Sequence, residues 1–120
     1  MKHPRAAVIV DGARTPIGKL NGALRSLPAS SLAAKAIEAA LKSARVRPED
    51  VQYTIMGQAL GAGAGQNPAR TAALEAGIPL NVPALTVNKV CLSGSSAVLL
   101  AQALIITGVH DVIVAGAWNP

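Results

Sequence analysis

The fold is decided by the stretch VNKVCLSGSSA, residues 87–97, in which a short apolar run passes into a long run of helix-forming residues. This change of pattern is typical of a buried strand followed by a helix. Cys91, the only cysteine of the chain, lies at that junction. Backbone N–H groups at a helix N-terminus are unpaired and attract negative charge, so the position favours a thiolate and predicts a nucleophile. The alternative is an inert core cysteine.

The same alternation extends over the rest of the chain. Apolar runs without polar interruption indicate strands that are buried on both faces, as parallel strands between helices are. We expect four such strands, near residues 6–11, 51–58, 84–89 and 112–117.

Three helices separate these strands in the sequence. The first begins near Ser30, and the second is capped by Asn67, starts with Pro68 and ends at Gly77. The third covers residues 92–107, so that Cys91 should lie within one residue of its start. Strands that alternate with helices predict an α/β fold, with a mostly parallel sheet and helices on both faces.

Composition narrows the possible functions. The 120 residues are enough for one domain. The net charge of +5 comes from scattered Lys and Arg, and aromatic residues make up only 2% of the chain, so we expect no nucleic-acid partner. The longest apolar run is shorter than the roughly 20 residues of a membrane span, so we expect no membrane partner. A single cysteine excludes an internal disulfide, and we expect a cytoplasmic protein. No residue set predicts a metal site.

Other motifs are weaker. The glycine-rich stretch at 61–65 lacks the dinucleotide spacing, because Gln66 stands where a glycine is needed, and it predicts a flexible connection instead. A cysteine nucleophile usually needs a histidine base. His3 precedes the first strand and lies at the wrong sheet edge, and His110 follows the third helix, roughly 25 Å from Cys91. The sequence therefore predicts a nucleophile without its base.

Four segments together resemble the thiolase family, specifically its acetyl-CoA acetyltransferases. They are VDGARTPIG at 10–18, GAGQNPAR at 63–70, VNKVCLSG at 87–94 and DVIVAG at 111–116. Two departures stand beside them, Ser95-Ser96 in place of a bulkier apolar residue and the ending at 117–120.

The resemblance implies a thiolase-like layered fold, in which residues 1–120 form the opening part of an incomplete N-terminal half. It implies that Cys91 takes the acyl group from an acyl-CoA thioester, with its own backbone N–H in the oxyanion hole. Two acetyl-CoA molecules would then condense to acetoacetyl-CoA, or the reverse cleavage would run. Coenzyme A thioesters would be substrates, with no permanently bound cofactor, and the protein would be a homo-oligomer, a dimer or a tetramer.

The family's catalytic histidine, second cysteine and asparagine come from a C-terminal half that these 120 residues do not include, so we expect the chain alone to be inactive. Most of the CoA-binding loop region is also outside the chain, and no CoA-contacting residue is predicted. Two alternatives stay open. One is a ketoacyl-synthase-like condensing enzyme, which shares the fold and the position of the cysteine. The other is a non-catalytic thiolase-like fragment that serves in assembly.

Overall fold

The sheet has three parallel strands in the order β2-β1-β3. In the computed structural model, which describes residues 5–119, these strands are β1 (Tyr53–Gln58), β2 (Ala84–Val87) and β3 (Ile113–Trp118). Thr54 of β1 pairs with Ala84 on one side and with Val114 on the other. The central position of β1 explains its burial: five of its six residues are buried. Three of the four expected strands are therefore confirmed, and each lies in the expected part of the chain.

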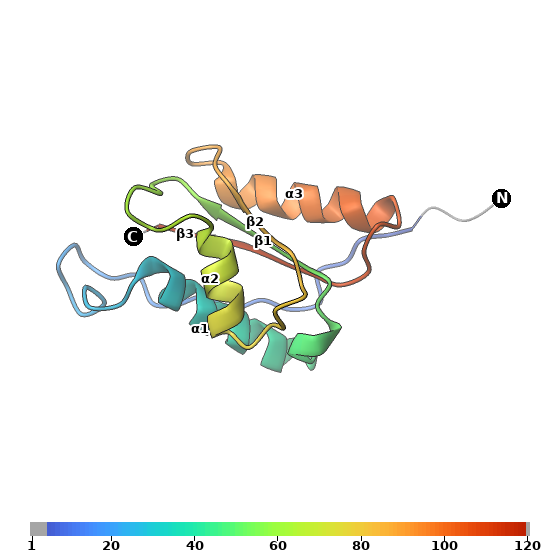
Figure 1. Cartoon of the computed structure of the whole chain (residues 1–120), viewed down its shortest axis with the longest axis horizontal. Coiled ribbons are helices and arrows are strands. Elements are labelled where there is room, and N and C mark those ends of the chain that lie inside the picture. Colours follow the sequence, from blue (N-terminus) through green and yellow to red (C-terminus); the bar gives the residue numbers. More distant parts are fainter. Residues whose placement is uncertain (1–4, 120) are drawn as a thin grey trace.

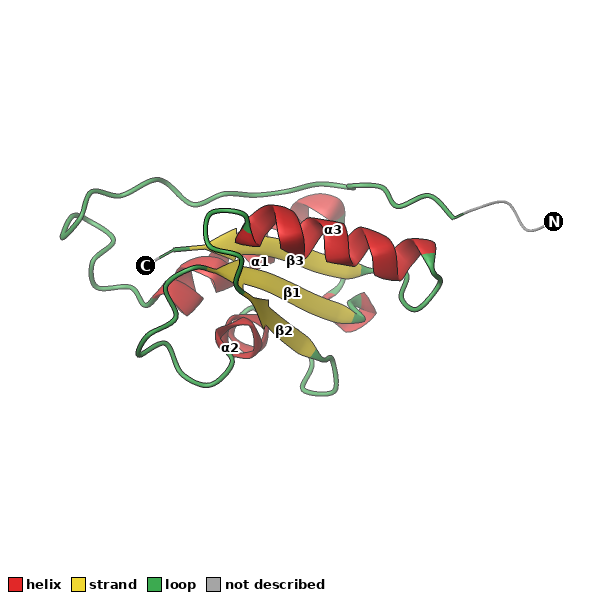
Figure 2. Cartoon of the chain, turned by 90° about the horizontal axis from the view of Figure 1, so that it is seen from above, coloured by secondary structure: helices red, strands yellow, loops and turns green. Residues whose placement is uncertain are grey.

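Helices cover both faces of this sheet (Figures 1 and 2). Helices α1 (Ala29–Ala44) and α2 (Pro68–Glu75) lie on one face, and α3 (Ser93–Ile106) lies on the other. A 3-10 turn, Pro48–Asp50, connects α1 to β1.

The hydrophobic core is correspondingly split. Ile37, Met56 and Ala72 are among the buried residues of the larger cluster, between the sheet and the α1–α2 layer. Ile55 and Ala97 belong to the smaller cluster under α3. Ile55 and Met56 show how one strand supplies both, because successive side chains point to opposite faces.

The helix ends follow the expected signals. The side chain of Asn67 accepts a hydrogen bond from the Arg70 backbone N–H at 3.3 Å, and Pro68 is the first residue of α2. Asn67 also donates to the Ala84 carbonyl at 3.1 Å, which ties the start of α2 to β2. Gly77 and Gly108 follow α2 and α3 with φ values of 85° and 78°. This left-handed conformation is one that glycine adopts without strain, so the predicted stops are confirmed.

The expected first strand, at residues 6–11, is wrong. This segment carries no strand, and Val8, Ile9 and Val10 are 73%, 83% and 69% exposed. It runs alongside the sheet layer without joining it (Figure 2). The apolar run favours an extended backbone, but a strand also needs a hydrogen-bonded neighbour, and no strand within residues 5–119 pairs with it.

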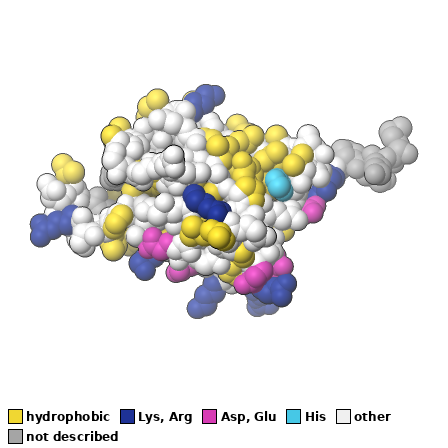
Figure 3. Space-filling model, viewed as in Figure 1, with side chains coloured by type: hydrophobic (Ala, Val, Ile, Leu, Met, Phe, Trp, Pro, Cys, Tyr) yellow, Lys and Arg dark blue, Asp and Glu magenta, His cyan; other side chains and the backbone are white. Residues whose placement is uncertain are grey.

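Figure 3 shows most of the Lys, Arg, Asp and Glu side chains of this face along the side formed by α1 and its neighbours. Apolar side chains gather toward α3, and others lie between the charged groups. None of the helices within the described part of the chain has the length and apolar content that a membrane span requires.

Candidate active site

The loop at residues 88–92 connects β2 to α3 and carries Cys91. Ser93, the first residue of α3, holds this loop from inside. Its Oγ accepts a hydrogen bond from the Lys89 backbone N–H at 2.9 Å and donates to the Val90 carbonyl at 2.6 Å. Ser93 is only 3% exposed, so both bonds are shielded from water. The loop is a braced turn, which fixes where the cysteine is presented.

Asn88 braces the same loop from the other end. Its Nδ2 donates to the Ala59 carbonyl at 3.1 Å, and its Oδ1 accepts from the Val90 N–H at 2.9 Å. One side chain thereby joins the loop to the chain just after β1. Strands β1 and β2 are parallel neighbours, so the cysteine loop lies at the carboxyl edge of the sheet, where sites of parallel α/β folds form.

Val90 has a positive φ of 51°. A β-branched residue rarely adopts this left-handed conformation, which costs about 1–3 kcal/mol. The two side-chain braces of the loop both act on Val90: Asn88 accepts from its N–H, and Ser93 donates to its carbonyl. The strained residue stands directly before Cys91, where it turns the backbone sharply and leaves the thiol on the outside of the turn.

Gly57 lets α3 approach the sheet at this point. A Cβ atom on residue 57 would stand 2.5 Å from the Ser93 carbonyl carbon and 2.6 Å from its oxygen. The backbone of β1 therefore touches the first residue of α3 directly. Sequence reasoning missed Gly57, Ser93 and Val90. A glycine inside a strand was the one available signal, since it often marks a close approach of another backbone.

Cys91 is exposed and has a free thiol. It lies two residues before Ser93, where α3 begins, so the expectation of one residue or less is wrong by one position. The helix starts later because the Ser93 side chain is used to close the loop, and the first helical bond runs from Ser96 N to Leu92 O at 2.9 Å. The Cys91 backbone N–H has no hydrogen-bond acceptor among residues 5–119. Thiol and N–H are thus both available to a ligand.

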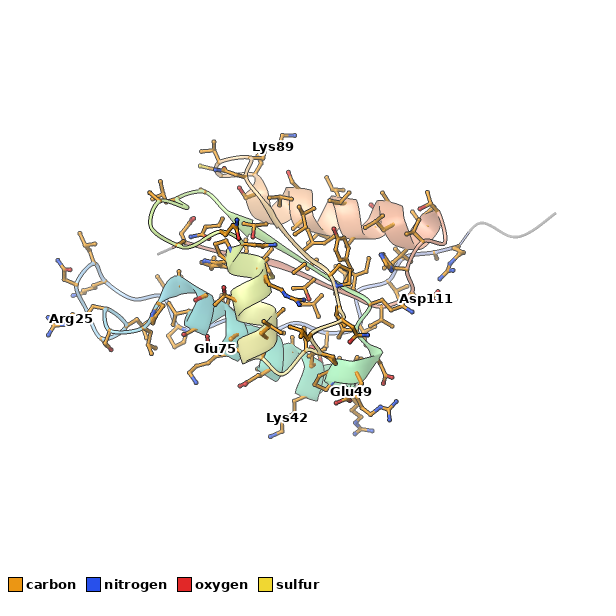
Figure 4. All side chains as sticks on the ribbon, viewed as in Figure 1. Arg25, Lys42, Glu49, Glu75, Lys89 and Asp111 are labelled. Carbon is orange, nitrogen blue, oxygen red and sulfur yellow. The ribbon has the colours of Figure 1, made fainter. Side chains whose placement is uncertain are left out.

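No histidine of the described residues approaches this thiol. His110 stacks on Tyr53, with ring centroids 5.3 Å apart, beyond the far end of α3. The 14 residues of that helix, about 21 Å, separate it from the cysteine loop. His3 lies outside the described residues. Lys89 extends into solvent away from the molecule (Figure 4). The site therefore combines an exposed cysteine with a fixed turn, and no histidine of residues 5–119 lies beside the thiol.

Metal ligands do not gather at this site in the described part of the chain. Within residues 5–119, no three His, Cys, Asp or Glu side chains gather closely enough to hold a metal ion. The chemistry that the residues can perform is nucleophilic attack by sulfur on an electrophile that reaches the turn from solvent.

Comparisons with known proteins agree with this geometry. The family model described as "Thiolase, N-terminal domain" matches residues 7–118. The chain is 62% identical over 110 residues to a probable acetyl-CoA acetyltransferase of Mycobacterium leprae, which covers 92% of this chain and 28% of that protein. It is 55% identical over 109 residues to an acetyl-CoA acetyltransferase of Cupriavidus necator, with 91% and 28% covered. The chain thus spans less than a third of the length of these relatives.

The fold of the chain is also similar to that of a solved structure. The crystal structure of the Bacillus anthracis acetyl-CoA acetyltransferase superposes with a TM-score of 0.90 and 37% identity, over 95% of this chain and 29% of that one. The expected thiolase-like α/β fold is confirmed by this superposition. With a family model that matches nearly the whole chain, this protein belongs to the thiolase family.

Proposed function

We propose that this chain supplies the nucleophilic half of an acetyl-CoA acetyltransferase, with Cys91 as the residue that carries the acyl group. One observation carries the proposal: the single free cysteine is exposed on a braced turn at the carboxyl edge of the sheet. Two relatives that match more than nine-tenths of the chain are named acetyl-CoA acetyltransferases, which supports acetyl-CoA as the substrate. The chain corresponds to 28% of their length, so the proposal concerns this part of the reaction.

The acyl-transfer step follows from the position of the thiol. The Cys91 sulfur attacks the carbonyl carbon of acetyl-CoA, and the carbonyl oxygen takes the negative charge. The Cys91 backbone N–H, which has no acceptor among the described residues, can donate a hydrogen bond to that oxygen. When the carbon–sulfur bond to coenzyme A breaks, coenzyme A leaves as a thiolate and takes up the proton that Cys91 lost. The product is an acetyl thioester on Cys91.

Condensation to acetoacetyl-CoA needs a further group. A second acetyl-CoA must lose a proton from its methyl group, and the described residues place no base near Cys91. We propose that this chain alone completes the acyl transfer but not the condensation or the reverse thiolysis. Coenzyme A thioesters are then substrates, and no cofactor resides in the site. A cytoplasmic homo-oligomer remains our expectation for the setting in which this occurs.

Intact-protein mass spectrometry tests the proposal. After incubation with acetyl-CoA at neutral pH, the chain should gain the mass of one acetyl group, and mild hydroxylamine should remove it. The matched control is Cys91→Ala, which should gain nothing. Acetylation that persists in Cys91→Ala, or no acetylation of a chain shown to be folded by circular dichroism, would refute the assignment.

The alternatives differ in measurable ways. A ketoacyl-synthase-like enzyme would share the acylated cysteine, but the comparisons favour the thiolases, because the matching relatives are named acetyl-CoA acetyltransferases. A non-catalytic assembly fragment would show no acylation of Cys91 while still binding other chains. The mass measurement therefore separates it from the nucleophile.

A further inference from the structure

Asn88 joins the loop that carries Cys91 to the chain that follows β1. Its Nδ2 donates a hydrogen bond to the Ala59 carbonyl at 3.1 Å, and its Oδ1 accepts one from the Val90 backbone N–H at 2.9 Å. An amide side chain supplies a donor and an acceptor from one planar group, and here both are used. Alanine offers neither, and serine is too short to reach the same two partners. The residue at position 88 thus bridges two segments of the backbone.

The peptide groups on both sides of Val90 are held. The bond from the Val90 N–H to Asn88 holds the peptide group that precedes Val90. Ser93 holds the one that follows, because its Oγ donates to the Val90 carbonyl at 2.6 Å and its N–H donates to the same oxygen at 3.1 Å. The φ and ψ angles of a residue relate these two planes to each other. The two contacts therefore act together on Val90, whose φ is 51°.

The conformation of Val90 depends on such contacts. A β-branched residue rarely has a positive φ, and it keeps one only where the surroundings determine it. Ser93 is buried and belongs to α3, so its bonds are part of the start of the helix. Asn88 is exposed, and its bond to the N–H two residues further along is a local contact of the kind that Asn forms in turns. Loss of the Asn88 side chain would thus let Val90 relax to a negative φ while the helix and the sheet stay in place.

The same turn decides how the backbone of Cys91 is presented. Within residues 89–93, four backbone amides donate inside the loop, those of Lys89, Val90, Leu92 and Ser93. The Cys91 N–H has no acceptor among residues 5–119. It shares a planar trans peptide group with the Val90 carbonyl, which points inward to Ser93, so the N–H points the opposite way. Relaxation of Val90 would rotate the peptide groups beside it, and one of them carries this N–H.

We propose that Asn88 is a positioning residue for Cys91. It holds Val90 in the left-handed conformation, and this keeps the thiol and the backbone N–H of Cys91 turned outward together. The proposal rests on the proposed function, in which the thiol takes the acyl group and the N–H donates to the carbonyl oxygen. Asn88 acts through Val90 and not by contact with the substrate.

Two variants separate the two bonds of Asn88. Asn88→Ala removes both, whereas Asn88→Ser keeps an oxygen that can accept from the Val90 N–H and loses the donor to Ala59. Acetylation of Cys91 by saturating acetyl-CoA, followed by intact-protein mass spectrometry, should slow about tenfold or more in Asn88→Ala and less than about threefold in Asn88→Ser. An equal fall in the two variants, or no fall in Asn88→Ala, would overturn the proposal.

The matched control is Asn81→Ala, which removes an exposed amide outside the loop and should leave the rate unchanged. Circular dichroism shows whether each variant folds. Should Asn88→Ala fail to fold, Asn88→Gln takes its place with the same expected fall, because the longer side chain does not close the same contact with the Val90 N–H.

Val90→Gly tests the route through Val90. Glycine adopts a positive φ readily, so it needs no support from Asn88. In the Val90→Gly chain, Asn88→Ala should slow acetylation less than about threefold, against about tenfold or more in the parent. A fall of the same size in both backgrounds would overturn the proposal, since a merely structural role of Asn88 would not depend on residue 90.

The φ angle of residue 90, measured by NMR from backbone couplings, gives a readout that needs no acetyl-CoA. It should be positive in the parent and in Asn88→Ser, and negative in Asn88→Ala. A parent chain that is not acetylated would refute the proposed function, and the φ values would still show whether Asn88 holds Val90. A positive φ retained in Asn88→Ala would overturn the role of Asn88 and leave the acylation of Cys91 standing.

Discussion

Gly57 and Ser93 are in backbone contact, so close that a Cβ atom on residue 57 would stand 2.5 Å from the Ser93 carbonyl carbon. The two residues are far apart in the sequence, one in the middle of the sheet and the other at the start of α3. Their contact fixes the helix on the sheet at the level where Ser93 closes the cysteine loop. The position of Cys91 thus depends on the absence of a side chain at residue 57 of β1.

Gly57→Ala should destabilise the chain, because the new methyl group meets backbone atoms that cannot rotate away. Overpacking of this kind costs about 1–3 kcal/mol, and we expect the upper part of that range. Urea denaturation measures it. Gly61→Ala is the matched control, since a Cβ there meets nothing within 4 Å, and it should be neutral or slightly stabilising. Equal effects of the two substitutions would contradict the close contact.

At residue 90 we expect the glycine variant to be more stable than the alanine variant, the reverse of the usual order. Because its φ is 51°, Val90→Gly should be more stable than Val90→Ala by about 1 kcal/mol. Ser95, exposed within α3, provides the control, and there Ser95→Ala should be more stable than Ser95→Gly by about the same amount. Thermal or urea unfolding of the four variants checks this. The same order at both positions would mean that Val90 is not strained.

Two contacts hold the N-terminal segment, residues 5–13, against the rest of the fold: the ion pair of Arg5 with Asp111 and the hydrogen bond from Ser43 to Asp11. Both should weaken in acid. Hydrogen bonds from Arg5 to Asp111 and from Ser43 to Asp11 lower the pKa of each carboxyl group. Groups whose pKa is lower in the folded chain stabilise it above their ordinary pKa, about 3.9, and that contribution is lost as the pH falls through the lowered values. The heteronuclear NOE values of Val8–Val10 should therefore fall between about pH 4 and pH 2.

The same loss should occur at neutral pH in Asp111→Asn, because the asparagine cannot form the ion pair with Arg5. Asp50→Asn is its control, since Asp50 is paired with Arg47 in the 3-10 turn and not with the N-terminal segment. If Asp111→Asn left the NOE values of Val8–Val10 unchanged, the ion pair would not be what holds the segment.

The sequence was sufficient for the elements whose signals are local. The cap at Asn67 and the stops at Gly77 and Gly108 depend on residues that are near one another in the chain, and the structure has them where they were expected. The strand at residues 6–11 failed for the opposite reason. Its apolar run predicts extended backbone, but pairing depends on a neighbour that the described residues do not supply.

At the candidate site, too, residues with a local sequence signal could be predicted and residues that act through distant contacts could not. Cys91 is predicted as the nucleophile from its residue type and its place in the pattern. Gly57 and Ser93 act through a contact between distant segments, which no local pattern reports. Val90 could not be expected, because a β-branched residue argues against the left-handed conformation that it adopts. Helix α3 begins one residue later than expected because the Ser93 side chain forms hydrogen bonds with the loop.

Self-association should follow from the apolar face of α3. Leu99 and Ile106 are 62% and 43% exposed, and seven residues apart they lie on one side of the helix. Light scattering at tens of micromolar should show more than a monomer, and Leu99→Lys with Ile106→Lys should reduce the associated fraction. Leu80→Lys changes an exposed leucine away from α3, at 73% exposure, and should leave association unchanged. A monomeric parent chain would contradict the expectation.

Cys91 should react quickly with iodoacetamide and yet support no condensation. Its thiol is exposed just before α3, and its backbone N–H, which has no acceptor among the described residues, can hydrogen-bond the carbonyl of iodoacetamide, so alkylation at neutral pH should be faster than that of glutathione. The control places the only cysteine at an exposed position within α3, as Gln102→Cys in the Cys91→Ala chain, and it should react more slowly. Acetoacetyl-CoA should remain undetectable with the 120-residue chain, because His110 lies beyond the far end of α3 and no described base replaces it. Measurable acetoacetyl-CoA would show that a base reaches the second acetyl-CoA after all. Alkylation no faster than that of the Gln102→Cys control would mean that the turn does not activate the thiol.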